Sequence, residues 1–458
     1  MPRPERSGSQ GRQDLTLGLA RALMRVASAA LLVVLGATPS AAGTDPYLQA
    51  TQGHSQTVTA TFFGTHFHRL DMGLPDDPGR TAWPQQSLGQ LRLWDAQTTW
   101  FNLQPAPDAW HFERLDAYVA AAGAAGARVL LTLGMTPAWN STRPDEPCPY
   151  TRGCSAEPRD LGAWKDYVRT VARRYGPRIA AYELWNEPLL SELPRDRGQR
   201  GFYTGSVHKL VAMAEAARQA LDEVAPGTPL CTPGFTNGVD RLALFLSAGG
   251  EHQVQALCFH LYAESNLKLA QTLVSLRRVQ RERGLGALPI WNTETGVEVA
   301  APGEKLIGGV VADWDSAATR LAQALVLSAA AGVERFYQYA WDNGRSGLVD
   351  AQGRPRPALA AFAQVQDWLM GRRVGPCRQP WLNRPGLVAC QTQGADGAHW
   401  LLWHTGAEPL RLRRAALARA LGARELQGID GAGHAAPAGF VDIGQALVRL
   451  AVLEGGPR

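Results

Sequence analysis

The sequence has little of what marks a metal-binding, nucleic-acid-binding or membrane-spanning protein. Only six cysteines occur in 458 residues, and no two of them have the C-x-x-C spacing of a zinc site. The formal charge is +5, and the first 42 residues hold five arginines against two acidic residues, so the rest of the chain carries only +2. Such a small charge gives no basis for nucleic-acid binding. The apolar run at 26–37, "VASAALLVVLGA", is shorter than the ~18 residues of a confident membrane span.

The N-terminal segment has the pattern of an export signal. Arginines precede the apolar run, and the small residues of "TPSAAG" follow it, which predicts a signal peptide over 1–42 with cleavage after Ala42. An uncleaved N-terminal anchor is the alternative, and Met24 lies close enough to the run to be another start of translation. We therefore expect a periplasmic or secreted protein with no stable membrane span after cleavage.

The cysteines fit an oxidising compartment. Cys148 and Cys154 bracket the loop "CPYTRGC", and Cys377 and Cys390 bracket a predicted hairpin, so we expect two disulfides. Cys231 and Cys258 lie instead in apolar, strand-like runs. We expect these two to be small buried core residues.

Apolar runs alternate with amphipathic segments along most of the chain. We count eight such runs: "ATFFGTHF", "LRLWD", "ARVLLTLG", "IAAYELWN", "TPLCTPG", "VQALCFHLY", "LPIWNTE" and "RFYQYAW". The segments between them have apolar residues at helical spacing, at 113–125, 161–175, 206–224, 266–283 and 315–331. Strand and helix in alternation favour parallel pairing, and eight units predict an α/β fold of the (β/α)8 TIM-barrel type. A doubly wound sheet is disfavoured because no glycine-rich phosphate turn follows the first run.

The pattern changes near residue 373. The later runs "GLVACQTQ", "HWLLWHTG", "LRLRR" and "ALVRLAVL" are short and separated by turn residues, although "RAALARALGARELQG" could be helical. We predict a catalytic barrel over 43–372 and a small β-rich, sandwich-like accessory domain over 373–458.

Two carboxylates occur where strands of such a barrel end. Glu187 follows the fourth run in "AYELWNEP", and Glu294 closes the seventh in "LPIWNTE". Functional residues of a (β/α)8 barrel lie at the carboxyl ends of its strands, so we expect these side chains to converge. Glycoside hydrolysis uses such a pair, with one acid for the leaving oxygen and one carboxylate for the anomeric carbon. A buried ion pair or two solvated loop carboxylates is the structural alternative.

Residues around these glutamates resemble the clan A glycoside hydrolases. The resemblance rests on "WNEP", on "NTETG" and on residues 91–141, spans about 59–370, and is nearest to family 39 and to related exopolysaccharide-acting enzymes. It implies that Glu187 is the acid/base and Glu294 the nucleophile of a retaining reaction. It also implies that Asn186 binds the sugar 2-hydroxyl, that Tyr262 hydrogen-bonds the nucleophile and that Arg92 steadies it.

Further candidates are aromatic residues and histidines. Arg92 could equally be a buried partner for Glu183, and His260 either faces the site or is a core histidine. Trp341 and Trp139 are candidate sugar-stacking residues. His66 and His68 are candidates for lining the pocket, and we expect no metal there because no third ligand is evident.

We therefore expect a monomeric retaining glycosidase that needs no cofactor and cleaves a β-linked poly- or oligosaccharide, with exopolysaccharide as one candidate. The alternatives are a non-catalytic carbohydrate-binding barrel and a polysaccharide-assembly partner.

Overall fold

The computed structural model describes residues 45–74, 79, 81–306, 309–381, 386–428 and 439–453. The predicted signal peptide at 1–42 lies outside these residues. Among the helices in the described ranges, none is both long enough and apolar enough to cross a membrane.

Eight parallel strands form the predicted barrel. They are β2 (Phe63–Thr65), β3 (Gln90–Leu93), β4 (Arg128–Thr132), β5 (Ile179–Glu183), β6 (Leu230–Cys231), β7 (Leu257–His260), β8 (Ile290–Thr295) and β9 (Val333–Gln338). Their order in the sheet is β6-β5-β4-β3-β2-β9-β8-β7. Single parallel bridges, Cys231 with Ala256 and Phe235 with Phe259, join β6 to β7. The (β/α)8 prediction is confirmed, and each predicted run contributes one strand.

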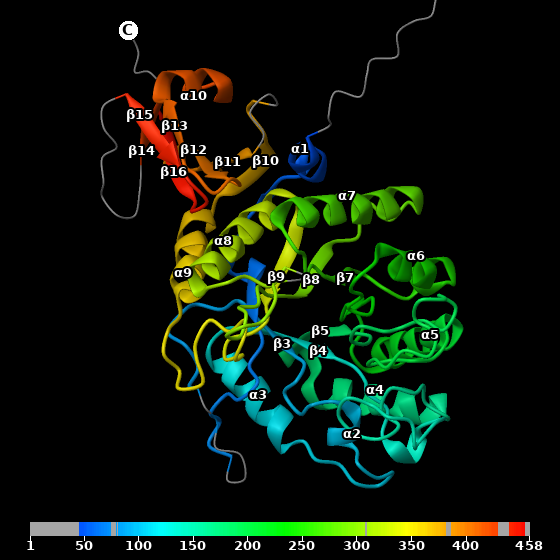
Figure 1. Ribbon diagram of the computed structural model, residues 1–458. Coiled ribbons are helices and arrows are strands. Elements are labelled where there is room, and N and C mark those ends of the chain that lie inside the picture. Colours follow the sequence, from blue (N-terminus) through cyan, green and yellow to red (C-terminus); the bar gives the residue numbers. More distant parts are fainter. Residues whose placement is uncertain are drawn as a thin grey trace, which may run out of the picture. The chain divides into compact units, whose positions relative to one another are not determined.

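Helices cover the outside of these strands (Figure 1). They are α3 (Glu113–Ala124), α4 (Leu161–Tyr175), α5 (Val207–Val224), α6 (Val239–Ser247), α7 (Asn266–Glu282), α8 (Trp314–Ala330) and α9 (Pro357–Leu369). Two short helices, α1 (Pro46–Thr51) and α2 (Trp100–Leu103), complete this part. The side chain of Asp160 caps α4 and that of Ser206 caps α5, each accepting a backbone N–H that the first turn leaves unpaired. The five helices predicted from the sequence begin and end within about one residue of their expected bounds.

The barrel interior is packed and cross-linked. Its side chains form one buried cluster, comprising Leu130, Ala181, Cys231, Ala256, Cys258, Trp291 and Tyr337. Cys231 and Cys258 are buried as expected, but they are not separate core residues, because they form a disulfide with their Cα atoms 5.7 Å apart. The cysteines lie on β6 and β7, which are neighbours in space, and the separation is within the ~4.4 to 6.8 Å that a disulfide requires. Burial of each residue was predictable, whereas their pairing depends on the closure of the barrel.

A β-rich region follows the barrel, drawn orange to red in Figure 1. It contains β10 (Arg373–Arg378), β11 (Leu387–Gly394), β12 (Gly397–His404), β13 (Leu410–Arg413), β14 (Glu425–Gly428), β15 (Phe440–Ile443) and β16 (Val448–Leu453), with helix α10 at Arg414–Leu421. The antiparallel sheet has the order β1-β10-β11-β12-β16-β14, while β13 pairs with β15. Strand β1 (Gln56–Thr57) comes from the N-terminal side of the barrel, which the sequence did not suggest.

Two further disulfides match the expected pairs. Cys377 lies opposite Cys390 in the β10–β11 pair, and the two are bonded. Cys148 and Cys154 are bonded across the loop that follows β4, with Cα atoms 5.7 Å apart. That loop therefore has a covalent closure over six positions.

Candidate active site

Glu187 and Glu294 meet at the carboxyl end of the barrel. Glu187 lies four residues beyond the end of β5, and Glu294 is the fifth residue of β8. One carboxylate oxygen from each, together with a ring nitrogen of His260, lie within 4.8 Å of one another. Two side chains 107 positions apart in the sequence therefore form one pair of carboxylates.

Glu294 is held by two donors. It is only 7% exposed, and Arg92 donates to its Oε2 at 2.8 Å while the Tyr262 hydroxyl donates to its Oε1 at 2.9 Å. Each carboxylate oxygen thus has a defined partner. The arrangement fixes the orientation of the carboxylate and leaves it little rotational freedom.

Arg92 connects most of the site. Its guanidinium also donates to Glu183 Oε2 and to Asn186 Oδ1, each at 2.7 Å, and the Arg92 side chain is fully buried. Arg92 thus contacts both Glu183 and Glu294, the two partners that the sequence suggested as alternatives. A guanidinium has five donors in a fixed plane, which suits it to this position.

The contacts of His260 determine its tautomer. Arg92 lies 3.3 Å from its Nε2, and Glu187 Oε1 lies 2.8 Å from its Nδ1. Because a guanidinium only donates, Nε2 is the acceptor in this contact and a neutral ring carries its proton on Nδ1. His260 is buried and donates to Glu187, so it contacts one of the two glutamates from within the core.

The backbone near Glu187 depends on Gly234. Glu187 has a φ of +41°, and its N–H donates to the carbonyl oxygen of Gly234 at 3.0 Å. A Cβ atom added at Gly234 would lie 2.3 Å from His260 Nε2 and 2.8 Å from a Glu183 oxygen. Only glycine allows this close approach without displacing the histidine.

Electrostatics at Glu294 oppose one another. Burial raises the pKa of Glu294, because a carboxylate loses solvation inside the protein. The nearby His260 and Arg92 act in the opposite direction, and the charges of Glu187 and Asp95 add to the rise. Burial and Glu294 both raise the pKa of Tyr262 above its usual range, so its hydroxyl stays protonated and able to donate.

The three acceptor groups within 4.8 Å have the geometry of a possible cation site, formed by Glu187, His260 and Glu294. Arg92 already brings a full positive charge to Glu294, and His260 directs an N–H at Glu187. These contacts disfavour a cation, since the Coulomb repulsion from Arg92 would act at short range.

Other predicted residues are placed less favourably. Trp341 is only 5% exposed and its ring lies 5.8 Å from the Phe67 ring, so its part in sugar stacking stays a prediction. Trp139 is half-buried, donates to the carbonyl oxygen of Gln104 and contacts Trp100. Neither has a hydrogen bond or ring contact with the two glutamates among the described residues.

The two histidines that follow β2, His66 and His68, pack against Tyr339. His66 is fully buried with its Nε2 3.2 Å from the carbonyl oxygen of Thr293, and burial holds its pKa well below the usual range. His66 and His68 lie 5.1 and 5.0 Å from the Tyr339 ring, between ring centroids. His66 is therefore neutral and helps pack the wall that carries Tyr339.

Sequence reasoning missed three residues at this end of the barrel. Asp95, which ends the second run, accepts hydrogen bonds from the hydroxyls of Tyr150 and Tyr339. Its place directly after "LRLW" is the same strand-end signal that identified Glu187, and it could have been used. Tyr150 lies in a loop whose sequence has no periodicity, so no local pattern marked it as a site residue.

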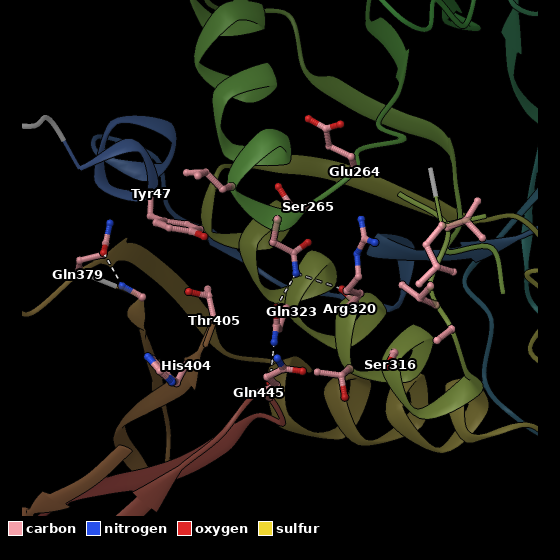
Figure 2. A pocket seen from close by; sticks show the side chains of 18 residues that line it. Tyr47, Glu264, Ser265, Ser316, Arg320, Gln323, Gln379, His404, Thr405 and Gln445 are labelled. Carbon is pink, nitrogen blue, oxygen red and sulfur yellow. Dashed lines mark hydrogen bonds between the residues drawn. The ribbon is translucent and has the colours of Figure 1, made fainter. Parts of the chain in front are cut away.

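Two cavities help to delimit the site. One of about 560 Å³ is lined by His260 and Tyr262 and continues along α7 to Lys268 and Arg278. Another of about 820 Å³, shown in Figure 2, is lined by α7, α8 and residues of the C-terminal strands, including Gln323 and His404. None of the predicted site residues lines this second cavity, so we place the chemistry at the glutamates.

The solved structures to which this chain is similar include several glycoside hydrolases. A family 39 glycoside hydrolase from the gut symbiont Bacteroides cellulosilyticus WH2 superposes with a TM-score of 0.60 at 18% identity, covering 80% of this chain and 76% of the other. A glucosidase from Croceicoccus marinus gives 0.55 at 17% identity, with 75% and 74% covered. The catalytic domain of a family 30 xylanase C from Talaromyces cellulolyticus gives 0.53 at 13%, with 87% and 100% covered.

At these identities the likeness shows the fold, and it agrees with the family resemblance of the sequence. No family model matches the chain, and no curated protein sequence matches it.

Proposed function

We propose that this protein is a retaining glycoside hydrolase acting on a β-linked poly- or oligosaccharide. The observation that carries the proposal is the separation of the two carboxylates, whose nearest oxygens lie within 4.8 Å. Retaining enzymes hold their carboxyl groups about 5 to 5.5 Å apart, whereas inverting enzymes leave about 6.5 to 9.5 Å for a water molecule. The three similar structures named above, each of a glycoside hydrolase, support the same class.

In the first step, Glu294 attacks the anomeric carbon and its new C–O bond replaces the glycosidic bond. Arg92 and Tyr262 hold the Glu294 carboxylate in one orientation, so attack needs little reorganisation. Glu187 gives its proton to the leaving oxygen. It is 23% exposed at its side chain, which leaves it accessible to that oxygen.

In the second step, Glu187 takes a proton from water, and the hydroxide oxygen displaces Glu294 with a second inversion, giving net retention. His260 keeps an N–H directed at Glu187 through both steps, which holds that carboxyl group in one orientation. Arg92 occupies the amide oxygen of Asn186, so the amide nitrogen is the group available to the sugar 2-hydroxyl.

The three disulfides favour an oxidising compartment, so we place the enzyme in the periplasm or outside the cell, with exopolysaccharide as a candidate substrate. We propose a monomer that acts without a cofactor.

The roles of the glutamates are tested by two variants. Glu187→Ala should retain its glycosylation step on an activated aryl glycoside, which needs little protonation, and lose about 10²- to 10⁴-fold on a natural sugar leaving group. Added azide should restore its turnover with retained configuration. Glu294→Ala should lose turnover on every substrate, and azide should restore it only with inverted configuration.

Product configuration is read by NMR, starting with the wild-type enzyme on a panel of aryl β-glycosides and polysaccharides. An inverted wild-type product, or an identical response of the two variants, would show that the roles are wrong. Unchanged activity in both variants would favour a structural role for the two glutamates.

A further inference from the structure

Tyr150 is an exposed aromatic residue at the mouth of the barrel. It is 43% exposed, and its ring is stacked against Phe202 at 5.9 Å with an interplanar angle of 29°. Trp94 meets the same ring edge-on at 5.8 Å, and Phe101 lies 6.2 Å away. These neighbours come from the loops after β3 and β5, so Tyr150 is supported from two sides and partly open to solvent.

The hydroxyl of Tyr150 is directed toward Asp95. It donates to Asp95 Oδ1, while the Tyr339 hydroxyl donates to Asp95 Oδ2 at 2.5 Å. Besides burial, the charges of Asp95 and Glu294 both raise the pKa of Tyr150 and that of Tyr339. Asp95 likewise raises the pKa of Glu294, so the two tyrosines, Asp95 and Glu294 are within electrostatic reach of one another.

The loop that carries Tyr150 is held in place. The Cys148–Cys154 disulfide closes around it, and Gly153 N–H donates to the carbonyl oxygen of Glu146 at 2.8 Å. Arg143 braces the same loop through ion pairs with Glu146 and Glu157 at 3.0 and 2.8 Å. Much of the cost of ordering an aromatic side chain for binding is therefore met before a ligand arrives.

Asp95 has an unusual backbone. Its φ is +59°, in the left-handed region that few non-glycine residues adopt. The other non-glycine residues with positive φ in the described ranges are Gln97, Glu187 and Asn237, and each follows a barrel strand near the mouth. Such backbone outliers cluster at functional sites, where the surrounding structure holds them.

We propose that Asp95 and Tyr150 form a sugar-binding subsite beside the two glutamates, which takes a neutral sugar ring of the substrate. This inference rests on the proposed function and specifies part of its substrate recognition. The exposed part of the Tyr150 ring packs against the apolar C–H face of the sugar. Asp95 accepts from sugar hydroxyls, because its two oxygens have about four acceptor positions and the tyrosines use two.

The charge of the site specifies the kind of sugar. The charges of Asp95 and Glu187 both act on Glu294, so three carboxyl groups lie close enough to one another to interact beside the proposed subsite. A uronate would add a further negative charge at short range, so like-charge repulsion selects against it.

Binding of cellohexaose and xylohexaose, measured by calorimetry on the disulfide-intact chain, tests the subsite. The parent protein is Glu294→Gln, which prevents hydrolysis. Tyr150→Ala in this parent should bind about tenfold more weakly, and Asp95→Asn about tenfold more weakly, since each loses a contact of about 1.4 kcal/mol or more. Tyr150→Phe keeps the ring and should lose only about threefold.

Arg152→Ala is the matched control, because Arg152 is exposed on the same disulfide loop, and it should bind like the parent. In the active chain, Tyr150→Ala should raise KM for the hexaose and leave kcat within about twofold, which a general loss of structure would not do. Thermal unfolding and disulfide mapping of every variant confirm that the loop is intact.

Equal binding by Tyr150→Ala and its parent would overturn the subsite and leave the proposed function standing. Failure of the parent to bind either hexaose would overturn the neutral-sugar assignment. The proposed function fails separately, through the azide and leaving-group responses of the two glutamate variants.

Discussion

Replacement of Arg92 by lysine tests whether the guanidinium of Arg92 keeps Glu294 in its ionised form. Arg92 donates to Glu183 and Asn186 at 2.7 Å and to Glu294 at 2.8 Å, and it contacts His260 at 3.3 Å. A lysine ammonium is one compact donor and cannot span acceptors spread along a planar fork. If it stays with the fully buried Glu183, Glu294 loses a charge-assisted hydrogen bond.

Such a bond contributes about 1.5 to 3 kcal/mol, and one pKa unit corresponds to about 1.4 kcal/mol, so the pKa of Glu294 should rise by about one to two units. Arg92 favours the ionised form, so its loss favours the protonated one. The acid limb of kcat/KM for Arg92→Lys should therefore move to higher pH by about that amount. The assay is a pH profile on an activated aryl glycoside, whose leaving group needs little help from Glu187.

Arg241→Lys is the control, because Arg241 forms a comparably buried ion pair with Asp196 that includes neither glutamate. It should lower the unfolding temperature and leave the acid limb in place. An unmoved limb in Arg92→Lys, or one displaced to lower pH, would refute the electrostatic reasoning.

Two further outcomes follow from the same structure. Burial raises the pKa of Glu294 above its ordinary value of 4.5, so the folded state loses stability as the pH rises from that value through the folded-state pKa. Glu294→Gln has no such ionisation and should therefore unfold at a higher temperature than wild type at pH 7. The difference between the two unfolding temperatures should shrink below about pH 4.5. A lower unfolding temperature of Glu294→Gln at pH 7, in scanning calorimetry, would contradict this. Non-reducing mass mapping of exported protein should recover Cys148 joined to Cys154, and two free thiols there would exclude the bridge.

The barrel and its two glutamates were predictable because they depend on local patterns. Each unit of the barrel has an apolar run followed by a segment with helical periodicity, and a carboxylate at the end of a strand interrupts an apolar run. Strand order then brings Glu187 and Glu294 together without any knowledge of side-chain contacts. Arg92 was predictable for the same reason, as a charged residue inside "LRLW".

The rest of the site depends on contacts between distant segments. Nothing local to Tyr150 indicates that its loop folds back onto Asp95, and nothing local to Trp341 indicates that it packs against Phe67. Strand β1 pairs with β10 although about 315 residues separate them, which no periodicity records. Apolar residues predict burial well, and they say less about which partner buries them.

Closure of the barrel supports the position of His260. Strand β6 has only two residues, so few hydrogen bonds join it to β7, and the Cys231–Cys258 disulfide cross-links the two strands at that point. His260 lies two residues after Cys258, and Gly234 lies three residues after Cys231. The pairing of β7 with β8 shifts between Phe259 and His260, an irregularity of the kind that redirects a side chain next to a functional site.

The disulfide thus anchors both segments whose close approach sets the histidine against Glu187. Backbone hydrogen bonds such as that from Thr232 N–H to the carbonyl oxygen of Ala256 join the two segments as well, and the positioning of the proposed acid/base depends on this pair of segments.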